Sequence, residues 1–163
     1  MIVLFRALTY ATLFIGLLLV FVPDRILAPA GIERPATIGL LQILAMLVIV
    51  AGAALAIASI LTFAFIGKGT PAPFDPPRKL VVAGPYRWVR NPMYIGAGLA
   101  LTGAALYYRS RPLAAYTALF LLVAYLFVLW YEEPTLRRTF GQEYEAYCRR
   151  VRRWLPRLSS GES

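Results

Sequence analysis

Histidine is absent from this sequence of 163 residues, and cysteine occurs once, at Cys148. Without histidine, the chain has no imidazole to act as a general acid or base. A cysteine–histidine metal site has too few ligands, and a disulfide within the chain is impossible. We therefore expect no metal, and any chemistry must rest on carboxylates, tyrosines, arginines and backbone groups.

Acidic residues are also scarce, with 8 Asp and Glu against 17 Lys and Arg, a net charge of +9. Such an excess could indicate nucleic-acid binding. However, 60% of the residues are hydrophobic and the mean hydropathy is +0.65, which is typical of an integral membrane protein. Basic loops of such proteins face anionic lipid headgroups. The expected partners are therefore membrane lipids and not nucleic acid.

Four apolar runs approach the roughly 20 residues that a membrane-spanning helix needs. They cover residues 2–22, 37–66, 92–108 and 113–131. The first lacks a small-residue cleavage pattern after Val22, so we interpret it as a helix and not as a signal peptide. The sequence predicts one all-α integral membrane domain over residues 1–163, with about four transmembrane helices. Residues 1–66 would form an N-terminal helical pair.

The basic residues are distributed unequally between the two sides of such a bundle. The side that carries both termini and the middle loop has 13 Lys and Arg, and the other side has 4. The positive-inside rule then predicts a multi-pass protein with both termini in the cytoplasm.

Two polar clusters flank the last two apolar runs. Residues 84–96 read GPYRWVRNPMYIG, and Glu132-Glu133-Pro134 closes the fourth run. Residues 109–112 predict a tight turn and hence an antiparallel helical hairpin, which brings both clusters to one cytoplasmic end. Asn91 and Pro92 are typical of a helix N-cap and first helical position, where free amides favour an anion.

Each cluster also has a simpler interpretation. Arg87 and Arg90 are typical of juxtamembrane topology signals, and Tyr86, Trp88 and Tyr94 of an interfacial aromatic belt. The two carboxylates are harder to explain in this way, because acidic groups near hydrocarbon are costly unless paired or functional.

Adjacent helical residues point about 100° apart. We therefore expect only one residue of the Glu pair to face the hairpin interior. The other would then meet solvent or an arginine such as Arg137 or Arg138.

Pro134 should end the fourth helix and start another. Beyond it, five residues repeat at helical spacing on one face, which predicts an amphipathic helix lying along the membrane or over the loop: Leu136, Phe140, Tyr144, Tyr147 and Val151. Trp154 would end this helix as an interfacial anchor.

Several motifs in order resemble one family. Residues 84–96, the Glu pair, FGQEYEAY at 140–147 and VRRWLP at 151–156 resemble the isoprenylcysteine carboxyl methyltransferase and phospholipid methyltransferase family of membrane enzymes. The resemblance covers about residues 80–157.

The resemblance implies S-adenosylmethionine as the cofactor and a lipophilic acceptor, either a carboxylate of an isoprenylcysteine-like or other lipid, or a lipid amine. An amine acceptor would require Tyr94 or Glu133 as a catalytic base. The residues implied to bind the cofactor are Leu80, Val81, Tyr86, Arg90, Asn91, Pro92, Met93, Tyr94 and Glu132.

Two positions depart from the family pattern. Asn91 stands where relatives usually have histidine, and Val128 stands where the prenylcysteine enzymes have an arginine. These departures leave open a non-catalytic membrane scaffold or lipid-binding protein. A second alternative is a sterol-reductase-like enzyme that uses NADPH, because sterol reductases resemble this family in their C-terminal half.

Overall fold

The computed structural model describes residues 9, 12–13, 15–31, 35, 37–67 and 79–156. Most of these residues are helical, and the described ranges contain no β-strand, only an isolated bridge between Val89 and Arg152. Most of the first apolar run up to residue 14 lies outside them. The α-helices are α2 (Val22–Leu27), α3 (Leu40–Thr62), α4 (Pro92–Tyr107), α5 (Arg111–Phe127) and α6 (Glu133–Arg150). Shorter helical segments are η1 (Ile15–Phe21), η2 (Phe63–Gly67), η3 (Gly84–Arg87) and η4 (Val128–Glu132).

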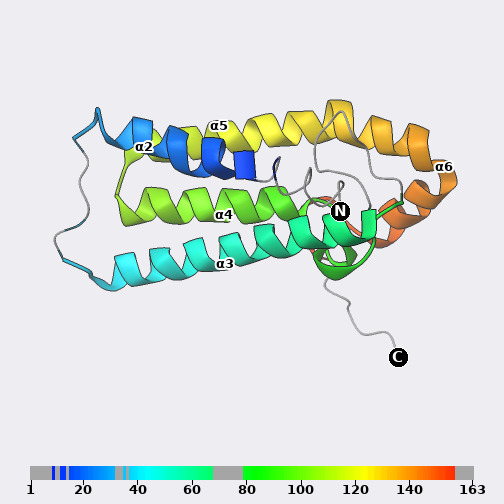
Figure 1. The fold of residues 1–163 in the computed structure, drawn as a ribbon, viewed down its shortest axis with the longest axis horizontal. Coiled ribbons are helices and arrows are strands. Elements are labelled where there is room, and N and C mark those ends of the chain that lie inside the picture. The colour runs from blue at the N-terminus through cyan, green and yellow to red at the C-terminus, as the bar shows by residue number, and fades with distance from the viewer. Residues whose placement is uncertain are drawn as a thin grey trace.

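The long helices α3, α4 and α5 lie side by side, and each runs antiparallel to the next (Figure 1). Helix α2 and segment η1 pack across α4 and α5, where the Tyr116 hydroxyl donates to the Leu18 carbonyl at 2.9 Å. The predicted hairpin of α4 and α5 is confirmed. Its turn contains Arg109 at φ 49°, and the Ser110 side chain caps α5 by accepting from the Leu113 amide at 3.2 Å.

Helices α3 and α4 approach closely enough for their backbones to touch. A Cβ atom added to Gly96 would lie 2.6 Å from the Gly52 carbonyl oxygen, and one added to Gly52 would lie 2.6 Å from that of Gly96. Helix pairs in membranes use small residues in this way, because close backbone approach increases van der Waals contact. The contact fixes the start of α4, and hence the predicted site, against α3.

Two described helical stretches are long and apolar enough to cross a membrane, Leu40–Gly67 and Arg111–Arg150. Only 28% of each apolar window is buried, so these are not the enclosed core helices of a soluble protein. Helix α4 has 16 residues and is therefore about 24 Å long, somewhat less than the hydrocarbon core. The number of four spans stays a prediction.

One predicted boundary is wrong, and another is right only in part. The first helical run continues past Val22 to Leu27, because Pro23 lies in the first turn of α2, where its missing amide removes no bond. Pro134 starts a helix as predicted, since it lies in the first turn of α6. It does not end the preceding one, because the helical stretch from α5 reaches it through the π-helical segment η4.

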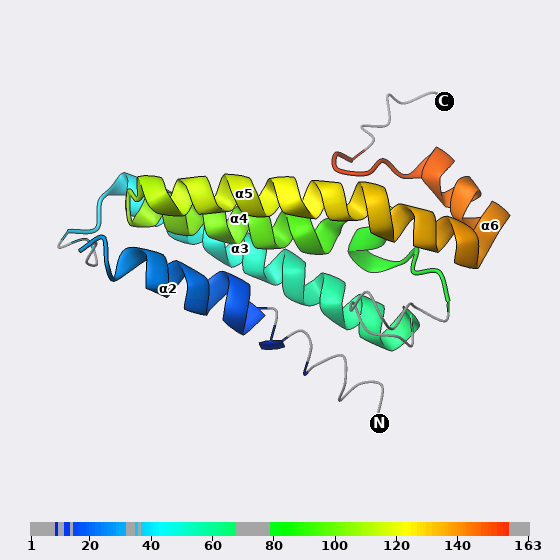
Figure 2. The same ribbon diagram turned by 90° about the horizontal axis from the view of Figure 1, so that it is seen from above.

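The chain turns instead at Gly141, whose φ of 48° and ψ of −121° interrupt α6. Beyond this glycine, α6 folds back toward the start of α4 (Figure 2). The side chains predicted to share a face still gather, since Tyr144, Tyr147 and Val151 form a core cluster with Leu136 and Phe140 packed against it. Leu80 from the loop before α4 packs there too, so this part of α6 covers the loop.

Candidate functional site

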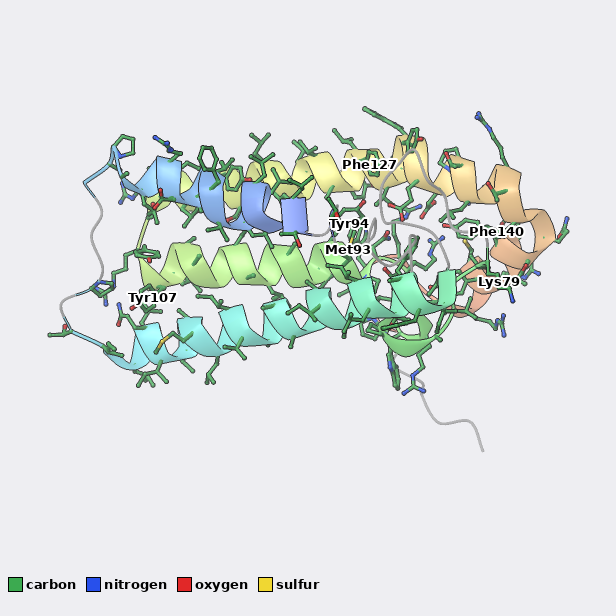
Figure 3. All side chains as sticks on the ribbon, viewed as in Figure 1. Lys79, Met93, Tyr94, Tyr107, Phe127 and Phe140 are labelled. Carbon is green, nitrogen blue, oxygen red and sulfur yellow. The ribbon has the colours of Figure 1, made fainter. Side chains whose placement is uncertain are left out.

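Three segments far apart in sequence meet at one end of the bundle: the loop from residue 79 to Asn91, the start of α6, and the tail at residues 151–154 (Figures 1 and 2). In Figure 3, Met93, Tyr94 and Phe127 lie close together toward this end, whereas Tyr107 lies at the opposite end of α4. Both polar clusters of the sequence therefore belong to one end of the molecule, as predicted.

Tyr94 and Glu132 form the contact between the two clusters. The Tyr94 hydroxyl donates to Oε2 of Glu132 at 3.2 Å. Tyr94 is buried against Ala124 and Val128, and Glu132 is half-buried. Among the described residues, no arginine or lysine pairs with Glu132. The carboxylate therefore lies near the protein interior, and no cation in the described part of the chain balances it.

Glu133 has the opposite surroundings. Its side chain is 3% exposed and accepts two hydrogen bonds from Arg153, from Nε at 2.6 Å and from Nη2 at 2.9 Å. Arg90 lies 3.3 Å away on the same carboxylate. The prediction of an arginine partner is confirmed, but the two arginines named for it are wrong, because Arg137 pairs with Glu145 at 2.8 Å and Arg138 is exposed. Of the two glutamates, Glu133 is the more deeply buried.

Arg90 is enclosed by α6. Its Nη1 donates to the Tyr144 hydroxyl at 3.4 Å and to Cys148 Sγ, in addition to its contact with Glu133. Its Nε is buried and has no hydrogen-bond partner among the residues that the structure describes. A buried guanidinium donor without an acceptor lowers stability, so this N–H group is available to donate to an oxygen atom of a ligand.

Asn91 occupies the predicted N-cap position, because α4 begins at Pro92 and the Ile95 amide donates to the Asn91 carbonyl at 3.2 Å. Its predicted capping bond is absent, however, since the side chain makes no bond to the first turn of α4. Its Nδ2 donates instead to the Arg153 carbonyl at 3.2 Å. Asn91 therefore connects the helix start to the tail.

Tyr86 and Val81 line the buried side of the loop. The Tyr86 ring lies 6.3 Å from that of Phe63, and its carbonyl accepts from the Tyr147 hydroxyl at 2.6 Å. Burial raises the pKa of Tyr86 above its ordinary value, and the negative charge of Glu132 raises it further. Tyr86 is therefore a neutral phenol within electrostatic range of Glu132.

The tail at residues 151–154 contacts the site more extensively than the sequence predicts. The Arg90 amide donates to the Arg152 carbonyl at 3.0 Å beside the bridge between Val89 and Arg152. The Trp154 ring packs on the Tyr94 cluster and stacks on Tyr125 at 6.2 Å, and its role as an interfacial anchor stays a prediction. The VRRWLP motif was the available signal, but side-chain pairing over 20 residues, between Glu133 and Arg153, cannot be read from spacing.

Comparison with known proteins shows the family of the chain. The sequence model of a family described as phospholipid methyltransferase matches residues 40–143, more than half of the chain. The chain belongs to the phospholipid methyltransferase family. The matched region runs from the start of α3 into α6 and includes Tyr94 and the Glu pair, whereas the tail lies beyond it.

Two curated relatives support this assignment. They are described as "Probable protein-S-isoprenylcysteine O-methyltransferase" from Oryza sativa, subspecies indica and japonica, and each is 34% identical over 91 residues. The match covers 51% of this chain and 44% of each relative. No solved structure matches the chain significantly.

Proposed function

We propose that this protein transfers a methyl group from S-adenosylmethionine to a lipophilic acceptor in the membrane. The observation that carries the proposal is the half-buried carboxylate of Glu132, which pairs with no cation among the described residues and accepts from Tyr94 near the start of α4. Membership of a methyltransferase family supports it.

The residues present fit the charges of this cofactor. Glu132 needs a cation and the buried Nε of Arg90 needs an acceptor, so a zwitterionic amino-acid group would satisfy both. The first amides of α4 would add donors for its carboxylate. Asn91, Pro92 and Met93 would hold this end of the cofactor, and Leu80, Val81 and Tyr86 would surround its adenosine.

When bound, S-adenosylmethionine supplies an electrophilic methyl carbon on a sulfonium. The protein's own contribution is alignment and exclusion of water, because Tyr94 orients Glu132 and the Met93, Phe127 and Trp154 side chains surround Tyr94 with apolar groups.

The contacts favour an acceptor that is already ionised. Glu133 is held by two arginines, and Tyr94 directs its proton to Glu132, so neither of the two candidate bases is free to remove a proton from an amine. A carboxylate acceptor needs no base at neutral pH. The names of the rice relatives, which refer to S-isoprenylcysteine, agree with an acceptor of this kind.

We place the site at the cytoplasmic face of a multi-pass bundle with both termini cytoplasmic. The 13-to-4 distribution of basic residues supports this topology. The exposed apolar surface of α5 and η4, including Leu122 and Trp130, would allow a lipid acceptor to approach from the bilayer.

Ligand binding by the purified protein tests the proposal against the alternatives. Calorimetric titration in detergent should show binding of S-adenosylmethionine and none of NADPH. Binding of NADPH alone would indicate a reductase, and binding of neither would indicate a scaffold, so either result would overturn the proposal.

A further inference from the structure

The tail at residues 151–154 contacts every part of the candidate site. The backbone of Arg152 pairs with Val89 and Arg90, and the Arg153 carbonyl accepts from Asn91. The Trp154 ring packs on Tyr94, Ala124 and Val128. These four consecutive residues therefore connect the loop, the start of α4 and the hairpin.

Arg153 joins this tail to the Glu pair. Its guanidinium contacts both oxygens of Glu133 at 2.6 and 2.9 Å, in the two-point geometry that fixes the plane of a carboxylate. The side chain of Arg153 is 28% exposed and that of Glu133 is 3% exposed. The pair is thus largely removed from water, where loss of one partner leaves an uncompensated charge.

Glu133 is also the residue next to Glu132, at the junction of η4 and α6. This junction lacks regular α-helical bonding, because the Glu133 amide donates to the Val128 carbonyl, five residues back. A π-helical turn leaves the orientation of its side chains less determined by the helix itself. Fixing Glu133 to Arg153 and Arg90 therefore fixes the direction in which Glu132 meets Tyr94.

We propose that Arg153 is a positioning residue for cofactor binding, which acts through Glu133 to orient Glu132 and touches no ligand itself. This inference rests on the proposed function. It concerns a tail that lies outside the region matched by the family model.

A double-mutant cycle tests the route of action. Arg153→Gln should weaken S-adenosylmethionine binding on the order of tenfold, and the same change in a Glu133→Gln background should have no further effect. Arg153→Lys keeps the positive charge without the two-point geometry, so it should lose less S-adenosylmethionine affinity than Arg153→Gln. The matched control is Arg138→Gln, because Arg138 is an exposed arginine of the neighbouring helix α6 that has no ion pair within the described residues.

Hydrogen exchange of amides supplies a readout that needs no cofactor. Arg153→Gln, but not Arg138→Gln, should accelerate exchange in residues 84–93 and 128–136. Wild-type affinity in Arg153→Gln, or equal losses in both backgrounds, would overturn the inference. If the wild type binds no S-adenosylmethionine, the proposed function is wrong. Exchange then decides the inference alone, and equal rates in Arg153→Gln and Arg138→Gln would overturn it.

Discussion

Glu132 and Glu133 are neighbours in sequence with opposite electrostatic surroundings. Glu133 is buried with two arginines, which compensate its charge, so it is part of the fold. Glu132 has only the neutral Tyr94 hydroxyl, so its charge is compensated by no described cation. A buried carboxylate without a cation is unfavourable for stability, and such groups are found where a ligand completes the site.

Glu132→Gln should therefore weaken S-adenosylmethionine binding by about 1–3 kcal/mol, because a charge-assisted bond to its ammonium group becomes neutral. Glu143→Gln is the matched control, since Glu143 is exposed. Calorimetric titration compares the two variants. Equal affinities would remove Glu132 from the site. Glu133→Gln differs from Glu132→Gln in its effect on stability. Any loss of S-adenosylmethionine affinity in Glu133→Gln should come with a lower melting temperature, because Arg90 and Arg153 would lose their partner.

Asn91 gives a second prediction, in which the structure reverses an expectation from sequence. For a simple cap, Asn91→Asp would be tolerated. Because the amide donates to the Arg153 carbonyl, aspartate removes the donor and sets a carboxylate against a carbonyl oxygen. We expect a loss of about 1–3 kcal/mol in stability and weaker cofactor binding.

Asn91→Ser removes the same amide without adding charge, so it should bind S-adenosylmethionine better than the Asp variant. Melting temperatures and affinities of both variants decide the point. If Asn91→Asp is as stable as the wild type and binds S-adenosylmethionine equally well, then neither the bond from Asn91 to the Arg153 carbonyl nor a contact of Asn91 with the cofactor matters.

At this scale, the sequence showed which residues gather but not how they pair. The motif order placed Tyr94 near Glu132 because a hairpin must bring its two ends together. The Glu133–Arg153 pair was missed, because it depends on the chain reversing at Gly141, and nothing in local spacing specifies the angle of that reversal.

At the scale of elements, the bend in the last helical stretch lies at a glycine and not at the proline where a break was predicted. Pro134 interrupts nothing, since a first-turn proline has no amide bond to lose, whereas Gly141 produces the bend. The helical period still grouped Tyr144, Tyr147 and Val151 correctly, because the residues after the bend keep the same spacing and contact the same loop. Element type was thus predictable, whereas the break was not.

Gly141→Ala should destabilise the protein by about 1–3 kcal/mol, because an L side chain is strained at a φ of 48° and ψ of −121°. Steric conflict does not contribute, since nothing lies within 4 Å of the added Cβ. Gly16→Ala is the control, with equally open space and no positive φ. Thermal unfolding in detergent measures both, and identical melting temperatures would contradict the strain.

At the scale of the whole molecule, one end of the bundle carries the loop, the Glu pair and the tail, and the other carries the turn between α4 and α5 (Figure 1). The exposed residues Lys79 and Arg111 mark these two ends. The proposed topology places them on opposite sides of the membrane, with Lys79 in the cytoplasm.

Single cysteines test this topology in a Cys148→Ser background. With an impermeant thiol reagent, Arg111→Cys should react in intact cells, and Lys79→Cys should react only after the membrane is opened. Reaction of both from the same side, or the reverse pattern, would show that the proposed site does not face the cytoplasm.

The central claim is methyl transfer to a membrane lipid at this end of the bundle. The most direct measurement supplies methyl-labelled S-adenosylmethionine to membranes that contain the wild type, Glu132→Gln or Glu143→Gln, and follows label in the lipid extract. We predict labelled lipid with the wild type and Glu143→Gln and a large loss with Glu132→Gln, with the label released as methanol by alkali if the acceptor is a carboxylate. Label in the extract that is no greater with the wild type than in membranes without the protein would contradict the claim.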